Sequence, residues 1–150
     1  MFSDFFYAAM AALFFALLFN VPKISIPVTA LLGGIGYVVF LIVGEQSSSQ
    51  MLGFFVGTSV ITILSEIAAR IMKLATTIFV SIAIIPLVPG LGLYKTMLFI
   101  VQNNYELALS TGIQTMSAAG TMAMAIAITT LLYRFIINLI AKINKSKVTI

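Results

Sequence analysis

Ile85-Pro86-Leu87-Val88-Pro89-Gly90-Leu91-Gly92-Leu93-Tyr94-Lys95 is the stretch that decides the fold. It lies inside an apolar segment long enough to cross a membrane, yet it contains two prolines and two glycines. Each proline removes a backbone donor and blocks the carbonyl one turn earlier, so a helix must kink or stop between Pro86 and Pro89. Broken backbone at membrane depth is tolerated only where protein covers it or where it lines a cavity. The stretch therefore predicts a discontinuous transmembrane helix, broken from Pro86 to Gly92.

The two residues that end this stretch, Tyr94 and Lys95, help to decide between a binding site and a simple kink. A proline kink with a lysine whose ammonium reaches the headgroups is the structural alternative. A lysine that faces lipid at mid-depth costs about 2.5–3.5 kcal/mol on insertion scales. Together with the double break, this cost favours a substrate site beside the start of the second half-helix.

Composition places the chain in a lipid bilayer. Hydrophobic residues make up 61% of its 150 residues and charged residues only 8%. A soluble domain carries about 25% charged residues. The length fits a single transmembrane domain, residues 1–150, with room for about five spans of roughly 20 residues each.

The residue types exclude several classes of function. The chain has no cysteine and no histidine, which removes disulfides, thiolate chemistry and the usual soft metal ligands, so we expect no metal and no cofactor. Four scattered carboxylates offer no recognisable catalytic constellation, so we do not expect an enzyme. The net charge of +4 comes from dispersed residues, which fits orientation in a membrane better than a nucleic-acid surface.

The apolar segments predict an all-α integral membrane protein with five transmembrane helices, at residues 2–19, 26–44, 51–72, 74–102 and 111–142. The fourth span would reach about 43 Å as one straight helix, well over the ~30 Å hydrocarbon core. Two half-helices joined by an irregular turn fit both lengths. The fifth span is also long, so it must tilt or protrude.

The charges in the loops predict the orientation of these spans. The loops of one side carry basic residues, and those of the other side carry only acidic ones: Lys23, Arg70, Lys73, Lys142, Lys145 and Lys147 against Asp4, Glu45 and Glu106. Basic loops stay in the cytoplasm. We therefore expect the N-terminus outside the cell and the C-terminus in the cytoplasm.

Polar residues within the spans suggest a route for a charge. Glu66 and Arg70 are four residues apart in the favourable acid-first order. They predict either an ion pair that anchors the helix end or a coupling and gating element in which Glu66 carries a proton. Further polar side chains suggest a path: Thr62, Gln114, Ser117 and Thr121. Hydroxyls in membrane helices also commonly bond to their own backbone, which is the alternative for these residues.

Small residues mark two faces for close helix packing. Gly53-x-x-x-Gly57 forms one face, and Ala119, Ala123 and Ala127 form a ridge at four-residue spacing. Such patterns are common, so they do not identify the helix that packs on them.

Four motifs stand in a recognisable order and spacing: Phe19-Asn20-Val21-Pro22-Lys23, Leu31-Leu32-Gly33-Gly34-Ile35-Gly36-Tyr37, Glu66-x-x-Ala69-Arg70 and Pro86-Leu87-Val88-Pro89-Gly90-x-x-x-Tyr94. Together they resemble the threonine/serine exporter family, specifically its small membrane-domain half. The resemblance covers nearly the whole chain, and the last motif is the most specific. The chain departs from the family at Ala75-Thr76, where a proline often precedes the fourth span.

The resemblance implies one part of a two-part exporter in the bacterial inner membrane, working with a larger family subunit or as a homo-oligomer. Members export threonine and serine, and a similar split pair exports succinate. All these substrates carry a carboxylate, and the start of the second half-helix exposes unpaired N–H groups that attract anions. The expected substrate-binding residues are Pro89, Gly90, Gly92, Tyr94 and Lys95. Coupling to a proton gradient is also implied, with Glu66 as the candidate carrier.

Two other functions stay open at this point. A non-transporting scaffold for a larger membrane partner would use the glycine and alanine faces equally well. A channel would need a continuous polar stripe along several spans, and only short stripes are visible.

Overall fold

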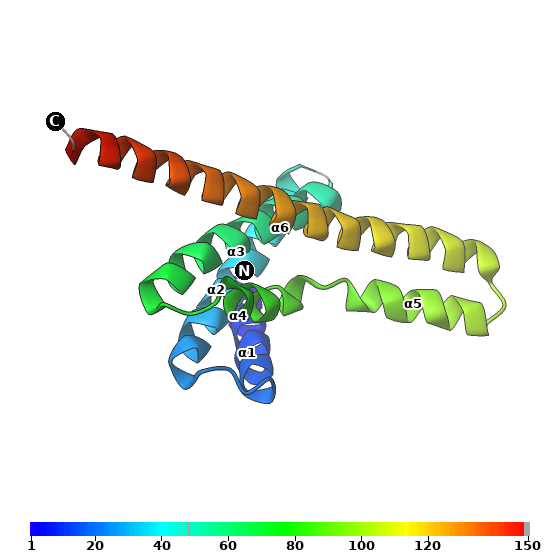
Figure 1. The fold of residues 1–150 in the computed structure, drawn as a ribbon. Coiled ribbons are helices and arrows are strands. Elements are labelled where there is room, and N and C mark those ends of the chain that lie inside the picture. Colours follow the sequence, from blue (N-terminus) through cyan, green and yellow to red (C-terminus); the bar gives the residue numbers. More distant parts are fainter. Residues whose placement is uncertain (48, 149–150) are drawn as a thin grey trace.

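Helices form all the secondary structure in the part of the chain that the structure describes. The computed structural model describes the backbone of residues 1–47 and 49–148, and the side chains of that range up to Leu139. In chain order (Figure 1) the elements are α1 (Phe2–Leu18), η1 (Lys23–Ser25), α2 (Ile26–Gln46), α3 (Gln50–Met72), α4 (Thr76–Ala83), η2 (Ile85–Leu87), α5 (Gly90–Val101) and α6 (Tyr105–Val148). The all-α prediction is confirmed for these residues. Three lysines used to predict the orientation lie outside the described side chains: Lys142, Lys145 and Lys147.

Three helical segments are long and apolar enough to cross a membrane: Lys23–Gln46, Gln50–Met72 and Tyr105–Leu139. A fourth candidate is the pair Thr76–Leu87 and Gly90–Val101, whose axes differ by 53° across a short break. That geometry fits either one broken span or a re-entrant loop. α1 is apolar but has only 17 residues. The described helices are therefore those of a multi-pass membrane protein, while the fifth span and the orientation stay predictions.

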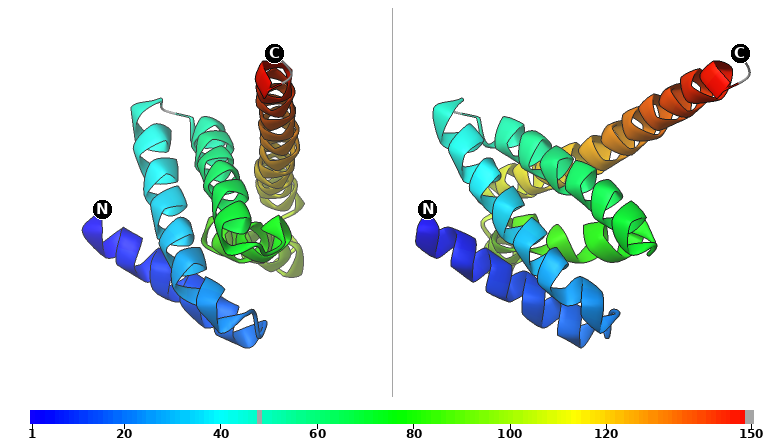
Figure 2. Two further views of the ribbon diagram at one scale, coloured as in Figure 1. Left: turned by 60° about the vertical axis from the view of Figure 1, so that its left-hand side comes forward. Right: turned by 90° about the vertical axis from the view of Figure 1, so that its left-hand side faces the viewer.

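Glycines let α3 pack closely on α2. A Cβ added at Gly53 would lie 2.7 Å from the carbonyl oxygen of Phe40, and one at Gly57 would lie 2.9 Å from the carbonyl oxygen of Gly36. Only a residue without a Cβ allows backbones to approach this closely. The predicted Gly53/Gly57 face is therefore occupied by α2 of the same chain, beside which α3 runs in both views of Figure 2.

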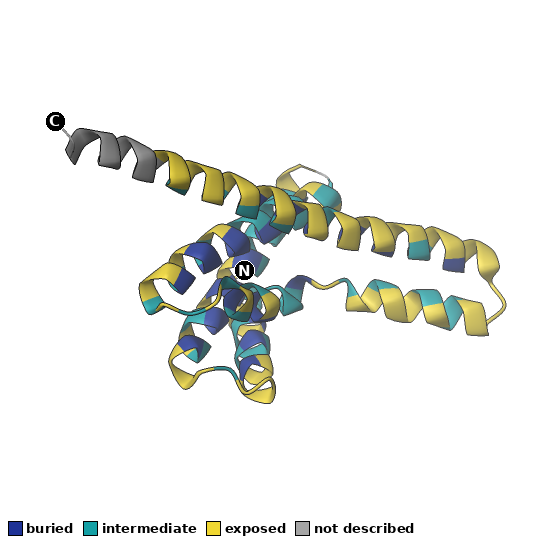
Figure 3. Cartoon of the chain, viewed as in Figure 1, coloured by how far each residue is buried: buried dark blue, intermediate teal, exposed yellow. Residues whose placement is uncertain are grey.

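The buried core lies where α2, α3, α4 and η2 meet, with α6 on one side. Phe79 of α4 and Ile61 of α3 are fully buried, and Leu87 of η2 and Met122 of α6 join the same cluster. In Figure 3 the buried positions concentrate in this bundle and become sparse beyond it.

α5 leaves this bundle and packs along the first half of α6, so the two helices form an arm (Figure 1). α5 has no buried residue. The two helices fit together through reciprocal small-residue contacts: a Cβ at Gly92 would collide with the Thr115 hydroxyl, and one at Gly112 would lie 3.3 Å from Thr96 Cγ2. The two helices of the arm therefore pack closely on each other, and no other described helix covers the outer side of α5.

α6 is longer than the span predicted at residues 111–142, whose bounds stay a prediction. The helix begins at Tyr105, because the Asn104 side chain accepts a hydrogen bond from the backbone N–H of Leu107 at 3.3 Å and caps it. The alanine ridge is exposed, and the positions buried against the rest of the chain are instead Ala118, Met122, Ala125 and Thr129. A four-residue spacing defines a face of a helix, but the neighbouring helix decides which face is covered.

Candidate functional site

The break between α4 and α5 leaves two backbone donors free. Pro86 lies in the short η2 helix, and beyond it the chain is extended at Val88 before α5 begins at Gly90. The Gly90 N–H donates to the Val88 carbonyl at 2.7 Å. Among the described residues, the N–H groups of Leu91 and Gly92 have no backbone acceptor. The start of α5 therefore offers two unpaired N–H groups and the positive end of a helix dipole, which together attract an anion.

The structure places the predicted substrate-binding residues around this helix start, on two different sides of it. Gly90 faces open space, since a Cβ there would meet nothing within 4 Å. Tyr94 is 63% exposed and Lys95 is also exposed. Gly92 instead contacts Thr115 of α6, a residue that sequence reasoning missed. Within the described part of the chain Lys95 forms no ion pair, so its ammonium is available to a ligand.

The site is open rather than enclosed. Only α6 packs along α5 to any extent, and the outward side chains of α5 are apolar apart from Tyr94 and Lys95. A groove of about 660 Å³ lies between α5 and α6, but its lining is almost entirely apolar and includes Ile100, Leu109 and Ile113. Such a lining does not suit a carboxylate. The helix start therefore suits an anion better than the groove does.

The predicted path residues do not come together as one lining. Gln114 and Ser117 are exposed on α6. The Thr121 hydroxyl donates to the Ser117 carbonyl at 2.8 Å, which is the bond to its own helix that the alternative reading expected. Thr62 is fully buried on α3, and its hydroxyl donates to the Thr58 carbonyl at 2.8 Å.

Glu66 is buried inside the bundle. Its side chain is 4% exposed, and Oε2 accepts a hydrogen bond from the Thr76 hydroxyl at 3.2 Å. Its other oxygen, Oε1, has no partner among the described residues. Thr76 opens α4, so this contact links α3 to the helix that leads into the break. Sequence reasoning missed Thr76, because nothing in the residues around it marks it as a partner for a carboxylate ten positions earlier.

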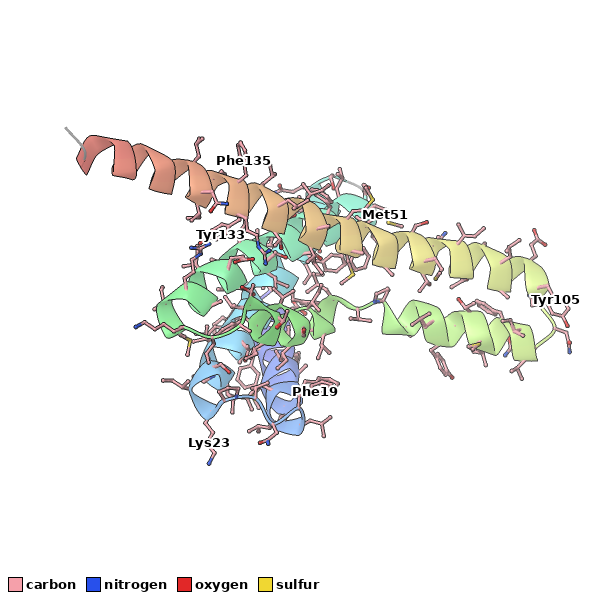
Figure 4. All side chains as sticks on the ribbon, viewed as in Figure 1. Phe19, Lys23, Met51, Tyr105, Tyr133 and Phe135 are labelled. Carbon is pink, nitrogen blue, oxygen red and sulfur yellow. The ribbon has the colours of Figure 1, made fainter. Side chains whose placement is uncertain are left out.

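Of the two alternatives for Glu66 and Arg70, the anchoring ion pair does not form among the described side chains. Arg70 is exposed, and its guanidinium carbon lies 5.2 Å from the ring centre of Tyr133 on α6. Figure 4 labels Tyr133, which lies on the part of α6 that passes α3. A guanidinium over an aromatic ring is a favourable contact that leaves the cation partly hydrated. Arg70 therefore ties α3 to α6, and Glu66 has no charged partner among the described side chains.

Comparison with known proteins gives three findings. A family model described as "Threonine/Serine exporter, ThrE" matches residues 4–132. A relative from Haemophilus influenzae, named only as an uncharacterized protein, is 29% identical over 138 residues, which is 87% of this chain and 46% of the relative. The chain thus spans about half the length of the curated relative that it matches. No solved structure matches it.

Proposed function

Since the chain belongs to the threonine/serine exporter family, a family of transporters, we propose that it forms part of a secondary exporter for a small carboxylate-bearing metabolite. Threonine and serine are the first substrates to consider, and a dicarboxylate such as succinate is the next. One observation carries the proposal for this chain: α5 begins with free N–H groups one turn before Lys95, which forms no ion pair with any described residue.

Each predicted site residue then has a physical role. Pro89 is the residue that precedes the first turn of α5, and its ring fixes φ where that helix begins. Gly90 keeps the approach to the helix start open. The free N–H groups of Leu91 and Gly92 bind the substrate carboxylate, and Lys95 adds a full positive charge. Tyr94 contributes a hydroxyl to the same exposed side.

The partner in this proposal covers the outer side of α5. The chain spans 46% of its curated relative, so the relative has further sequence of similar length. α5 has no buried residue within this chain, and its site residues are exposed. We expect a second membrane subunit of the same family, or a second copy of this chain, to complete the site. With an odd number of spans, two similar halves would sit in opposite orientations, as in inverted-repeat transporters.

Glu66 is the proposed coupling residue. A carboxylate within a membrane span commonly marks an ion route, and Thr76 connects it to α4, which leads to the break. Glu66→Gln keeps the size and the Thr76 contact but removes the charge. We expect this variant to insert normally and to lose export driven by an ion gradient. Full gradient-driven export by Glu66→Gln would remove Glu66 from this role.

The test of the binding site is an efflux measurement with the partner subunit present. Cells that express Lys95→Ala should lose export of threonine, serine or succinate, whichever the wild type carries, at an unchanged level of membrane-inserted protein. Lys23→Ala is the matched control, because it removes the same charge from an exposed position in η1. Normal efflux by Lys95→Ala would exclude that lysine from the site.

A scaffold role is the second candidate, because the bare outer side of α5 would serve assembly as well as binding. Photocrosslinking of a labelled substrate analogue to the purified pair distinguishes the two functions. Label on α5 supports the transport role, and label confined to the partner supports the scaffold.

A further inference from the structure

The start of α5, which carries the proposed anion site, is held in place by a neighbouring helix. α5 follows an extended residue, Val88, and has no buried residue of its own. Among the described elements only α6 packs along α5 to any extent, and the two helices run side by side in Figure 1. The direction in which the free N–H groups of Leu91 and Gly92 point therefore depends on how α6 holds α5.

Gly92 is in close contact with α6. A Cβ added at Gly92 would lie 3.3 Å from both Cβ and Cγ2 of Thr115, and it would lie closer still to the Thr115 hydroxyl oxygen. Thr115 is 5% exposed, and its hydroxyl donates to the Thr111 carbonyl at 2.7 Å. Because this bond selects one of the two χ1 rotamers open to a threonine in a helix, Thr115 presents a fixed surface to Gly92.

A second contact lies one turn further along α5, and here the glycine belongs to α6. The Thr96 hydroxyl donates to the Gly92 carbonyl at 2.8 Å. Thr96 Cγ2 lies 3.3 Å from the position of a Cβ added at Gly112 of α6. A single contact between two helices would leave each free to turn about its own axis. Two contacts one turn apart fix both the rotation and the register of α5 on α6.

Gly92 is thereby held on two sides while its N–H stays free. Its carbonyl accepts a hydrogen bond from Thr96, and its Cα faces Thr115. Its N–H has no backbone acceptor among the described residues. A hydrogen bond weakens steeply as its angle at the hydrogen falls toward about 120°. A small rotation of α5 would therefore turn this N–H away from a bound anion without unfolding the helix.

We propose that Thr115 is a positioning residue for the substrate carboxylate, because it fixes the rotation of α5 so that the Gly92 N–H points into the anion site. The inference rests on the proposed function, since it requires the start of α5 to bind the carboxylate. Thr115 acts through Gly92 and does not itself touch the substrate. Its effect is on binding, so it changes the substrate concentration that gives half-maximal export and not the maximal rate.

Uptake into inside-out membrane vesicles that contain this chain and its partner subunit separates these two quantities. The substrate concentration at the cytoplasmic side is then set directly, with threonine, serine or succinate, whichever the wild type carries. Thr115→Ala removes the hydroxyl and the methyl group that face Gly92. We expect it to raise the half-maximal concentration about tenfold, which equals about 1.4 kcal/mol and is close to the value of one hydrogen bond to a charged group. The maximal rate per inserted protein should change little.

Two further variants separate positioning from folding. Thr115→Ser keeps the hydroxyl, and with it the Thr111 bond and the closest contact to Gly92, so its half-maximal concentration should stay near that of the wild type. Thr29→Ala is the matched control. Thr29 is a fully buried threonine whose hydroxyl also bonds to a carbonyl four residues earlier, but it lies on α2. It should lower at most the amount of inserted protein.

Two other measurements keep the inference testable if Thr115→Ala does not insert or does not transport. Thr96→Ala removes the second contact, so it should also raise the half-maximal concentration. Binding can be followed without transport in the purified complex, because Leu91→Cys places an exposed cysteine beside the site in a chain that has no other. Substrate should slow its reaction with a maleimide, and Thr115→Ala should raise the concentration that gives half of this protection by the same factor.

Three outcomes would overturn the positioning role: an unchanged half-maximal concentration in Thr115→Ala, an equal rise in Thr29→Ala, or a Thr115→Ser variant as impaired as Thr115→Ala. These outcomes differ from failure of the anion site itself. If Lys95→Ala loses export while Thr115→Ala binds substrate as the wild type does, only the positioning role is wrong. If Lys95→Ala and Thr115→Ala both export normally, the anion site does not lie at the start of α5.

Discussion

The contact between Gly92 and Thr115 holds the arm together, and a single methyl group tests it. An added Cβ at Gly92 would overlap the Thr115 hydroxyl far inside van der Waals contact, and it would lie 3.3 Å from both Thr115 Cβ and Cγ2. The hydroxyl can move only by breaking its hydrogen bond of 2.7 Å to the Thr111 carbonyl, and rotation brings another substituent of the branched side chain toward α5.

The expected cost of Gly92→Ala follows from these contacts. Breaking the Thr115 hydrogen bond costs about 1 kcal/mol, and overpacking of a tight contact typically costs about 1–3 kcal/mol in total. The better helix propensity of alanine offsets at most about 1 kcal/mol of this. We therefore expect Gly92→Ala to lower the free energy of unfolding by about 1–2 kcal/mol.

Two variants make the measurement specific. Gly90→Ala is the matched control, because its Cβ meets open space and the residue has no positive φ, so stability should stay equal or rise slightly. Gly92→Ala combined with Thr115→Ala should recover most of the loss, since the colliding hydroxyl is gone. The measurement is unfolding of the purified chain in detergent, followed by circular dichroism. Gly92→Ala at least as stable as Gly90→Ala, or no recovery in the double variant, would refute the close contact.

Three further predictions concern the core, the link to α6 and the orientation. Phe79→Ala should lower the free energy of unfolding by about 3–5 kcal/mol, because Phe79 is fully buried and its removal leaves a cavity; unfolding in detergent measures this. Arg70→Gln should lower the free energy of unfolding, measured in the same way, by about 0.5–1 kcal/mol. If the contact with the Tyr133 ring is the source of this loss, Arg70→Gln should have no effect in a chain that already carries Tyr133→Leu. The chain has no cysteine, so single cysteines report topology directly: Ser47→Cys should react with an impermeant maleimide from outside intact cells, and Lys23→Cys only after permeabilisation. The reverse labelling would invert the proposed orientation.

A stop in helical structure at the prolines could be predicted from sequence because proline chemistry is local, whereas a single broken span stays a prediction. α4 ends at Ala83 and α5 begins at Gly90, on either side of the two prolines that force the stop. The direction of the second piece was not predictable. The 53° bend depends on how the start of α5 packs on α6, and that contact joins residues more than twenty positions apart.

Helical spacing predicts which side chains share a face of a helix, but it does not predict which residues of other helices they contact. Thr58, Thr62, Ser65 and Glu66 are all buried, and helical geometry alone puts them near one face of α3. The same spacing allowed an ion pair between Glu66 and Arg70 as one alternative, and this pair does not form because Tyr133 and Thr76 supply other partners from other helices. Such partners depend on the tertiary packing, which local sequence does not encode.

The open side of α5 has a consequence for how the proposed exporter works. If lipid alone covered α5, two unpaired N–H groups and an ammonium would lie against hydrocarbon, and each unpaired group there costs several kcal/mol. That cost is of the same order as the whole stability of a typical domain. Water, a substrate or a partner helix must therefore cover this side in the membrane. Each covering satisfies the same donors, so we expect substrate binding and partner contact at the start of α5 to depend on one another. Leu91→Cys tests this, because the Leu91 side chain is exposed and only its backbone N–H belongs to the proposed site. A crosslink between this cysteine and the partner should change in yield when the substrate is added.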